Sequence, residues 1–306
     1  MNPKYCVYIG DVALDEYYRV DTWPGVKDKA LVDALPAIPG GMIANAACVA
    51  AALGLNVKFL AMLNSGPVTR FLLEDLEKSG VDTSMVIFDD RLPDSKTMIF
   101  LVDDEHTIFI PRLGIEAIYI TREQLEFLAG AEFVYTTPTE IGALRCEEMD
   151  SAAIIDYCRA QGAKLVYDLD VDYVRDGSEE RYQRLDIAFF NEVGFDSYRR
   201  DLDYRAAADR LLGYGLELVV VTLAENGCIV FTRAETLRSP GYPVDVVDVT
   251  GAGDTFCSSF VYALSLGKGI AYAAAFANAA ASICVGKLGA RAGAVSKEEV
   301  ERVLRL

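Results

Sequence analysis

The second half of the chain alternates regularly between strand-like apolar runs and helical patterns, and this alternation constrains the fold more than any other feature. Strand-like runs at 132–138, 164–170 and 187–193 are separated by segments with helical spacing of apolar residues, at 146–162 and 178–185. A helix between successive strands returns the chain to the start of the sheet, so that the strands run parallel. The sequence therefore predicts an α/β fold in which helices cover both faces of a mostly parallel sheet, where ligands bind at the carboxyl ends of the strands.

Two segments of the first half, at about 12–36 and 95–112, do not follow this alternation. Each contains short strand-like runs with a broken pattern, and we expect them to form a small lid of strands above the sheet. The single histidine, His106, falls in the second segment at an expected exposed position of a hairpin. The chain shows neither an internal repeat nor a linker-like boundary, so a single domain is expected over 1–306.

The charge of the chain limits its partners. It has 29 basic and 46 acidic residues and a net charge of −17. Nucleic acid is not expected as a partner, because a phosphate backbone needs a basic face. A small anionic ligand remains compatible with this charge, since the N–H groups of a helix N-terminus bind anions without lysine or arginine.

Cysteine and histidine usage narrows the class of protein further. Seven cysteines without a Cys-x-x-Cys pair indicate buried, reduced thiols in a cytoplasmic protein. The start of the chain does not resemble a signal peptide, and the apolar windows 42–55 and 270–286 are shorter than the roughly 20 residues of a membrane span. One histidine excludes a multi-histidine zinc site and disfavours a Ser–His–Asp triad.

The stretch DVTGAGDTF, residues 248–256, combines small residues with an acid. The helical pattern that follows places Gly251, Ala252 and Gly253 in the first turn of a helix, whose N–H groups then form an anion hole of backbone. A carboxylate beside an anion hole would repel a bound anion, so Asp254 is better suited to the role of a general base acting on a hydroxyl. A simple capped turn is the alternative on these residues alone.

Two motifs together resemble the PfkB, or ribokinase-like, family of carbohydrate kinases. VVDVTGAGDTFCSSFVYAL at 246–264 is similar to the C-terminal signature of that family. PGGMIANAACVAAALG at 39–54 resembles its Gly-Gly-x-x-x-Asn segment, and YIGDVALDEYYRVDTWP at 8–24 resembles its opening strand and first lid strand. The resemblance spans nearly the whole chain and implies a ribokinase-like three-layer α/β/α domain with a β-strand lid.

The resemblance implies roles for individual residues. The sugar would bind between sheet and lid, with Asp15 and Asn45 contacting its hydroxyls, Gly41 allowing close approach and Asp11 belonging to the same set. Asp254 would be the base and 251–253 the anion hole. Four further matched residues would bind the nucleotide: Asn191, Thr222, Gly227 and Asn278. Three others would bind metal ions: Glu192, Asp248 and Thr250. ATP and Mg²⁺ are the expected cofactors, and a monovalent cation such as K⁺ would bind at Asp248 and Thr250.

Departures from the family pattern bear on metal use and substrate. Gly194 stands where the Asn-x-x-Glu motif of the family has glutamate, and Glu192 is the candidate replacement, although neighbouring residues at a strand end point in different directions. Ala13 and Met42 stand where the ribokinase branch has asparagine and lysine. Ribose is therefore disfavoured, and Arg112, at the expected end of the second lid strand, resembles an arginine that binds the carboxylate of sugar acids in some relatives.

The leading hypothesis is an ATP-dependent kinase acting on a hydroxyl of a small sugar or sugar acid, with a primary hydroxyl expected. One alternative is a nucleoside kinase of the same fold, in which Tyr17, Tyr18 and Trp23 of the lid would hold a base. The other is a pseudokinase that binds sugar or nucleotide without catalysis. A homodimer that covers the exposed lid edges is also expected from the resemblance. The sequence does not identify the sugar or the pathway.

Overall fold

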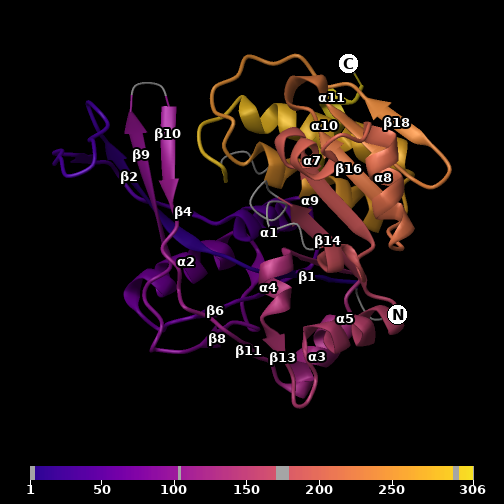
Figure 1. Cartoon of the computed structure of the whole chain (residues 1–306), viewed down its shortest axis with the longest axis horizontal. Coiled ribbons are helices and arrows are strands. Elements are labelled where there is room, and N and C mark those ends of the chain that lie inside the picture. Colours follow the sequence, from indigo (N-terminus) through magenta and orange to yellow (C-terminus); the bar gives the residue numbers. More distant parts are fainter. Residues whose placement is uncertain (1–3, 103–104, 170–178, 292–295, 306) are drawn as a thin grey trace.

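The central element of the computed structural model, which describes residues 4–102, 105–169, 179–291 and 296–305, is a nine-stranded sheet (Figure 1). Seven neighbouring strands run parallel, and the last two form an antiparallel extension at one edge. In spatial order the strands are β18 (Thr236–Ser239), β17 (Cys228–Phe231), β16 (Leu218–Thr222), β15 (Ile187–Asn191), β14 (Lys164–Leu169), β12 (Phe133–Thr136), β1 (Cys6–Ile9), β5 (Val57–Leu60) and β7 (Val81–Asp82).

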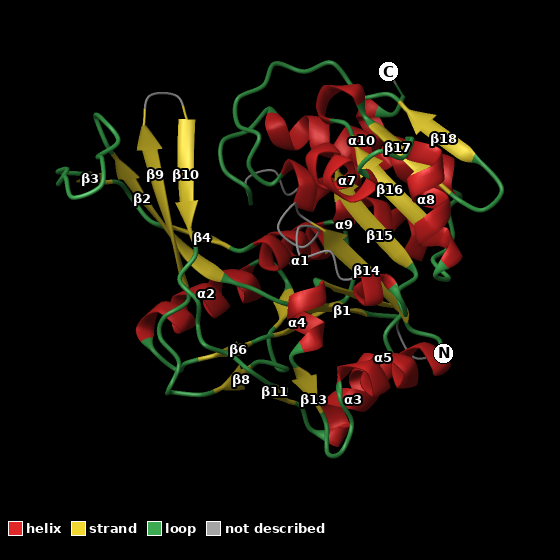
Figure 2. Ribbon diagram, viewed as in Figure 1, coloured by secondary structure: helices red, strands yellow, loops and turns green. Residues whose placement is uncertain are grey.

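Helices cover both faces of this sheet and give it the expected three layers (Figure 2). Alternate residues of one strand face opposite layers: Cys6 and Tyr8 belong to one apolar core, and Val7 and Ile9 to the other. One face packs α1 (Met42–Ala52), α2 (Pro67–Lys78), α9 (Ala252–Ser265), α10 (Ile270–Val285) and α11 (Lys297–Val303). The other packs α3 (Arg122–Ala129), α4 (Pro138–Gly142), α5 (Ser151–Ala160), α7 (Glu192–Arg199) and α8 (Tyr204–Gly213).

The lid is a second, smaller sheet that projects from one end of the molecule, at the left of Figures 1 and 2. Its strands are β10 (Glu105–Phe109), β9 (Lys96–Val102), β2 (Ala13–Arg19), β3 (Asp33–Ala34) and β4 (Ile38–Gly40). Trp23 stacks on Phe109, with a ring-centroid distance of 6.1 Å, and both rings contact Phe100 edge-on. The lid thus confirms the prediction, but it extends to Gly40, beyond the expected limit of 36.

Two short parallel strand pairs lie outside both sheets. They are β6 (Met62–Leu63) with β8 (Ile87–Phe88), and β11 (Ile118–Tyr119) with β13 (Leu144–Arg145). His106 lies on the exposed edge strand β10, as expected for a hairpin position.

Side-chain caps explain why some helices and strands begin or end at other residues than expected. The helix expected from 146 begins at Ser151, because the Asp150 side chain accepts the backbone N–H of Ala153 and caps it. The expected strand 187–193 ends at Asn191, whose side chain caps the unexpected helix α7. The described part of 178–185 forms only a 3₁₀ turn, Glu179–Tyr182.

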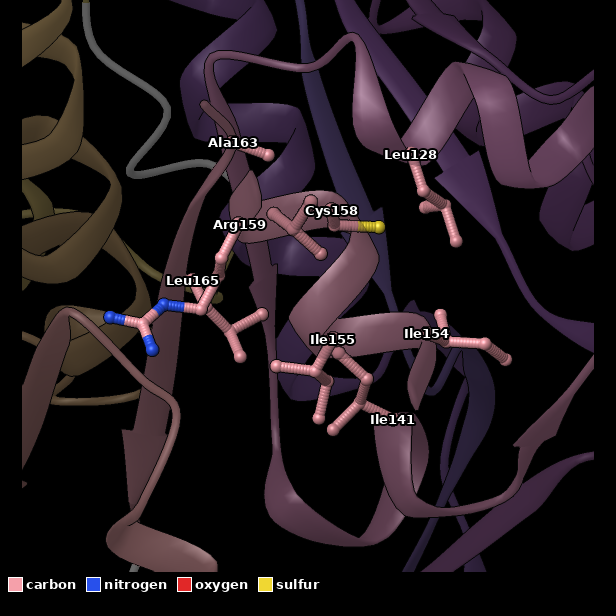
Figure 3. Close-up of a pocket in the computed structure, with 9 residues that line it drawn as sticks. Leu128, Ile141, Ile154, Ile155, Cys158, Arg159, Ala163 and Leu165 are labelled. Carbon is pink, nitrogen blue, oxygen red and sulfur yellow. The ribbon is translucent and has the colours of Figure 1, made fainter. Parts of the chain in front are cut away.

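The interior of the structure is closely packed. Figure 3 labels residues that line a small hole between α5, its neighbouring helices and the sheet. The hole measures about 10 Å³, and its lining is apolar except for Arg159, so it is a packing gap without room for a ligand. All seven cysteines are buried and free. In the described part of the chain, none of the helices combines the length and apolar character that crossing a bilayer requires.

Candidate functional site

The first turn of α9 is a surface almost free of side chains. Gly251 occupies the N-cap position with φ 79°, and a Cβ there would lie 2.7 Å from the Cα of Ala290, so glycine is required. At Gly253 a Cβ would meet no atom within 4 Å, so the space in front of this residue is open. The N-terminal turn thus presents backbone N–H groups and the positive end of the helix dipole to an open cleft.

Asp254, in the same turn, meets the other sequence motif. Asn45 on α1 is 7% exposed, and its Nδ2 donates to Oδ2 of Asp254 at 3.0 Å. Small residues let the two helices approach closely: Ser258 Oγ of α9 donates to the carbonyl oxygen of Ala46 on α1 at 2.7 Å. Two residues separated by 209 positions in the sequence are therefore brought into direct contact.

Arg291 completes this arrangement and was not anticipated from the sequence. Its Nε donates to Oδ1 of Asn45 at 3.0 Å, and its Nη2 donates to the carbonyl oxygen of Gly40 at 3.0 Å. Its Nη1 forms an ion pair with Asp75 of α2, and the arginine side chain is only 15% exposed. A lone arginine among small residues resembles a loop residue, and only the tertiary contacts reveal its place in the site.

Asp11 and Gly41 have structural tasks at the start of α1. The two carboxylate oxygens of Asp11 accept the backbone N–H groups of Met42 at 3.0 Å and Ile43 at 3.1 Å, and so cap the helix. Gly41 has φ 100°, and a Cβ there would lie 2.8 Å from the carbonyl oxygen of Asp11. Packing against the end of the first strand is therefore sufficient reason for glycine at this position.

Two further acids lie near Asp11 and have raised pKa values. Burial raises the pKa of Asp15 to about 6, a nearby negative Asp11 adds to the effect, and Thr97 and Arg291 oppose it. Burial and the charge of Asp11 raise the pKa of Glu140, on α4, to about 7. We call Asp11, Asp15, Glu140, Asn45 and Arg291 the acceptor side of the site. Its described residues include three carboxylates and one guanidinium.

A cleft of about 500 Å³ opens on the other side of the α9 turn. Predicted nucleotide residues Thr222, Gly227 and Asn278 line it together with Ala252 and Gly253. Most of the remaining wall is apolar, from Tyr242, Pro243, Val244, Val246, Val249, Phe256, Ala281 and Val285.

Asn278 also holds the wall of this cleft in place. It is 6% exposed, and its Nδ2 donates to the carbonyl oxygens of Ser239 and Pro240, both at 3.1 Å. The amide thereby fixes the start of the loop that follows β18 and forms one lip of the cleft.

The predicted nucleotide residue Asn191 does not line this cleft, and its side chain accepts the backbone N–H of Gly194 at 2.6 Å. Of the predicted metal residues, Glu192 is the exposed first residue of α7 rather than a strand end. Asp248 accepts the N–H groups of Thr250 at 2.9 Å and Gly289 at 2.8 Å. Burial alone would raise the pKa of Asp248, but these bonds outweigh it and lower the pKa.

No group of three or more His, Cys, Asp or Glu side chains gathers into a metal site among the described residues. Single carboxylates such as Glu192 and Asp248 suit an ion that is held mainly by phosphate oxygens and water. Mg²⁺ commonly accompanies a nucleotide in this way.

Arg112 does not end a lid strand, because β10 ends at Phe109. It lies in the loop that follows, is exposed, and forms neither a hydrogen bond nor an ion pair with the described residues. Its guanidinium is therefore available to a ligand, although the structure does not bring it into the network around Asp254.

Comparison with known proteins agrees with this architecture. Over 280 residues the chain is 26% identical to the 5-dehydro-2-deoxygluconokinase of Bacillus subtilis (strain 168), covering 87% of this chain and 86% of the relative. It is 25% identical over 310 residues to the ribokinase of Staphylococcus aureus (strain COL), with 97% and 98% covered.

Solved structures resemble it closely in fold. A ribokinase from Thermotoga maritima matches with a TM-score of 0.83 at 25% identity, covering 99% of this chain and 100% of that chain. An Arabidopsis thaliana ribokinase complexed with ribose and ATP matches with a TM-score of 0.84 at 23% identity, with both chains covered in full (100%).

The family match extends over almost all of the chain. Residues 3–297 match the model of the pfkB family carbohydrate kinases, including both the α1 and the α9 segments. The chain belongs to the pfkB family of carbohydrate kinases and is a phosphotransferase with an alcohol as acceptor.

Proposed function

We propose that this protein transfers the γ-phosphoryl group of ATP to a hydroxyl of a small sugar or sugar acid, with Asp254 as the general base. The observation that supports this most is the position of Asp254. It lies in the α9 turn between the nucleotide-sized cleft and the acceptor side, and Asn45 donates to its Oδ2 at 3.0 Å. A base at this boundary is within reach of a hydroxyl that faces a phosphoryl group.

The proposed reaction uses the turn and the acid together. Asp254 takes the proton of the acceptor hydroxyl as its oxygen attacks the γ-phosphorus, and the bond from that phosphorus to the β–γ bridging oxygen breaks to release ADP. The backbone N–H groups at 251–253 stabilise the charge on the transferring oxygens. Asp254 then returns its proton to solvent.

Metal ions would assist from the phosphate side. Mg²⁺, when bound with the nucleotide, neutralises phosphate charge, and we assign Asn191 and Glu192 to its water shell. We assign Asp248 and Thr250, in the loop before α9, to a monovalent cation such as K⁺. Asp248 is suited to it by its lowered pKa, which keeps the carboxylate charged.

We assign the acceptor to the space between the acceptor side and the lid. Asp15 and Asn45 offer a carboxylate and an amide, which can accept from and donate to sugar hydroxyls. A second copy of the chain is proposed to cover the lid, where β10 is an unpaired edge strand and Ile110 is 74% exposed.

The test is Asp254→Asn, assayed with ATP and Mg²⁺ against ketoses, aldoses, sugar acids, polyols and nucleosides. The amide cannot act as a base, so kcat on the acceptor is expected to fall by about 1,000-fold. Thermal unfolding should be nearly unchanged. Asp209→Asn, which removes an exposed acid on α8, is the matched control and should retain full activity. Near-normal turnover by Asp254→Asn would refute the mechanism. A wild-type protein that transfers phosphate only to nucleosides would identify a nucleoside kinase.

A further inference from the structure

We infer that Arg291 is a positioning residue that sets the orientation of the Asn45 amide, and through it the catalytic base, while tying both to the lid. The inference rests on the proposed role of Asp254. Arg291 lies within a short segment of small residues and touches neither the α9 turn nor the nucleotide cleft by any described hydrogen bond. The inference depends on its three partners: it donates hydrogen bonds to Asn45 and Gly40 and forms an ion pair with Asp75.

Hydrogen-bond chemistry allows the Asn45 amide only one orientation. A guanidinium has donors and no acceptor, so the group facing Arg291 Nε must be the carbonyl oxygen Oδ1. The amide nitrogen is then left to face Asp254, whose carboxylate oxygen accepts it at 3.0 Å. Without the guanidinium, Oδ1 of Asn45 would lose this donor, and only the bond to the Asp254 carboxylate would hold the amide.

The three partners of Arg291 come from three different elements. Asn45 lies on α1, Asp75 on α2, and Gly40 on the lid strand β4. That strand pairs with β2, where Ala13 is opposite Gly40 and Asp15 is opposite Ile38. A displacement of the lid strand would therefore move the same guanidinium that orients Asn45.

The planar guanidinium is suited to this task in a way that other cations are not. It holds its donors in a fixed fork, so that bonds to Gly40 and Asn45 together define the position of the group. Asp75 compensates the charge of this largely buried side chain, with 35% of the aspartate side chain exposed. Asp75 thus balances the charge of Arg291, while the bonds to Asn45 and Gly40 give the guanidinium its geometric role.

A double-mutant cycle in the whole protein tests the inference. Arg291→Met removes all donors at similar length, and it is measured alone and combined with Asn45→Ala, below the unfolding temperature of each variant. In the wild-type background kcat should fall by about 100-fold, as expected for a displaced base, while KM for ATP stays the same. In the Asn45→Ala background the same change should have less than about a threefold effect.

Two conservative variants give an independent readout. Arg291→Lys keeps the charge but not the fork, and it should recover only part of the lost kcat. Asp75→Asn keeps an acceptor for the guanidinium and should lower kcat by less than Arg291→Met. If Arg291→Met does not fold, these two variants replace it in the cycle, with the same loss of effect expected when Asn45 is absent.

Equal effects in the two backgrounds would overturn the inference, because Arg291 would then support the fold independently of Asn45. An Arg291→Met variant with normal kcat would overturn it as well. Neither result affects the proposed function, which fails instead if Asp254→Asn remains active. The two failures are therefore distinguishable.

Discussion

The two sides of the site differ in the chemical groups that line them. The cleft proposed for the nucleotide is bounded by a bare helix turn and by apolar side chains such as Val244 and Phe256. The acceptor side is a dense set of charged and amide groups, in which Asn45 is bonded to both Asp254 and Arg291. The turn at the start of α9 lies between the two, and its Asp254 contacts Asn45 of the acceptor side.

This difference indicates how each reactant would be recognised. A cleft of backbone and apolar surface fits any ligand with the right shape and a phosphate tail. Charged and amide groups instead select for particular hydroxyls and charges, since an unmatched polar partner is costly. The described acceptor side includes three carboxylates, and its guanidinium, Arg291, is paired with Asp75, so an anionic acceptor needs a cation from outside this set. Arg112 is the candidate, because its exposed guanidinium lacks a partner among the described residues.

Of three further variants, the one with the largest expected effect is Gly253→Ala, on the nucleotide side. The new methyl group would meet no protein atom within 4 Å, so the fold should be unaffected or slightly more stable. The methyl group would, however, project into the space proposed for the phosphoryl group. We expect kcat/KM for ATP to fall by about 100-fold, measured by steady-state kinetics.

Gly213→Ala is the matched control for this change. Gly213 ends α8, also has open space at its Cβ position, and lies outside the cleft. Equal kinetics for the Gly253 and Gly213 variants would show that the bare turn does not serve nucleotide binding. The proposed recognition of a phosphate tail by backbone in the cleft would then be wrong.

A smaller, selective effect is expected on the acceptor side from Arg112→Gln. If the acceptor is a sugar acid, loss of the guanidinium should raise KM for it by about 10-fold or more, because a charge-assisted bond to the carboxylate is lost. KM for ATP should stay the same, and so should KM for neutral sugars. An unchanged KM for every acidic acceptor would exclude a carboxylate contact at this position.

The smallest effect is on stability, from Glu140→Gln. The folded protein raises the pKa of Glu140 from 4.5 to about 7, so it keeps this proton where the unfolded chain has lost it. The stability that the protonated acid contributes is therefore lost as pH rises from 4.5 to about 7. Glutamine avoids this loss and should stabilise the protein above pH 7 by roughly 1 kcal/mol.

Thermal unfolding at two pH values checks this prediction. The variant should unfold about 2–4 °C above the wild type at pH 8, and at nearly the same temperature at pH 4.5. A difference that is equal at both pH values would show that Glu140 does not hold its proton, and that the acceptor side is less crowded with charge than the geometry indicates.

The sequence was informative where local patterns determine structure. The alternation after residue 132 predicted the parallel sheet, and the small residues at 251–253 predicted the first turn of α9. Helix α7 was missed because its cap, Asn191, ends a continuous apolar strand, and the change of structure depends on one side-chain bond.

The acceptor side was harder to predict because it depends on distant contacts. Arg291 lies 246 positions from Asn45, and nothing in its neighbourhood in the sequence indicates a buried ion pair. Glu140 gained its significance from α4, a short helix that the sequence pattern did not reveal. The contact between Asn45 and Asp254 was not predicted, since neither motif specifies the other.

The seven buried cysteines have a practical consequence for watching this molecule work. Burial raises the pKa of every one of these thiols, so thiolate-directed reagents should leave them untouched in the folded protein. A single new thiol at an exposed lid position such as Ile110 would then react alone. A fluorophore attached there would report whether a second copy of the chain covers the lid, without removing any native cysteine.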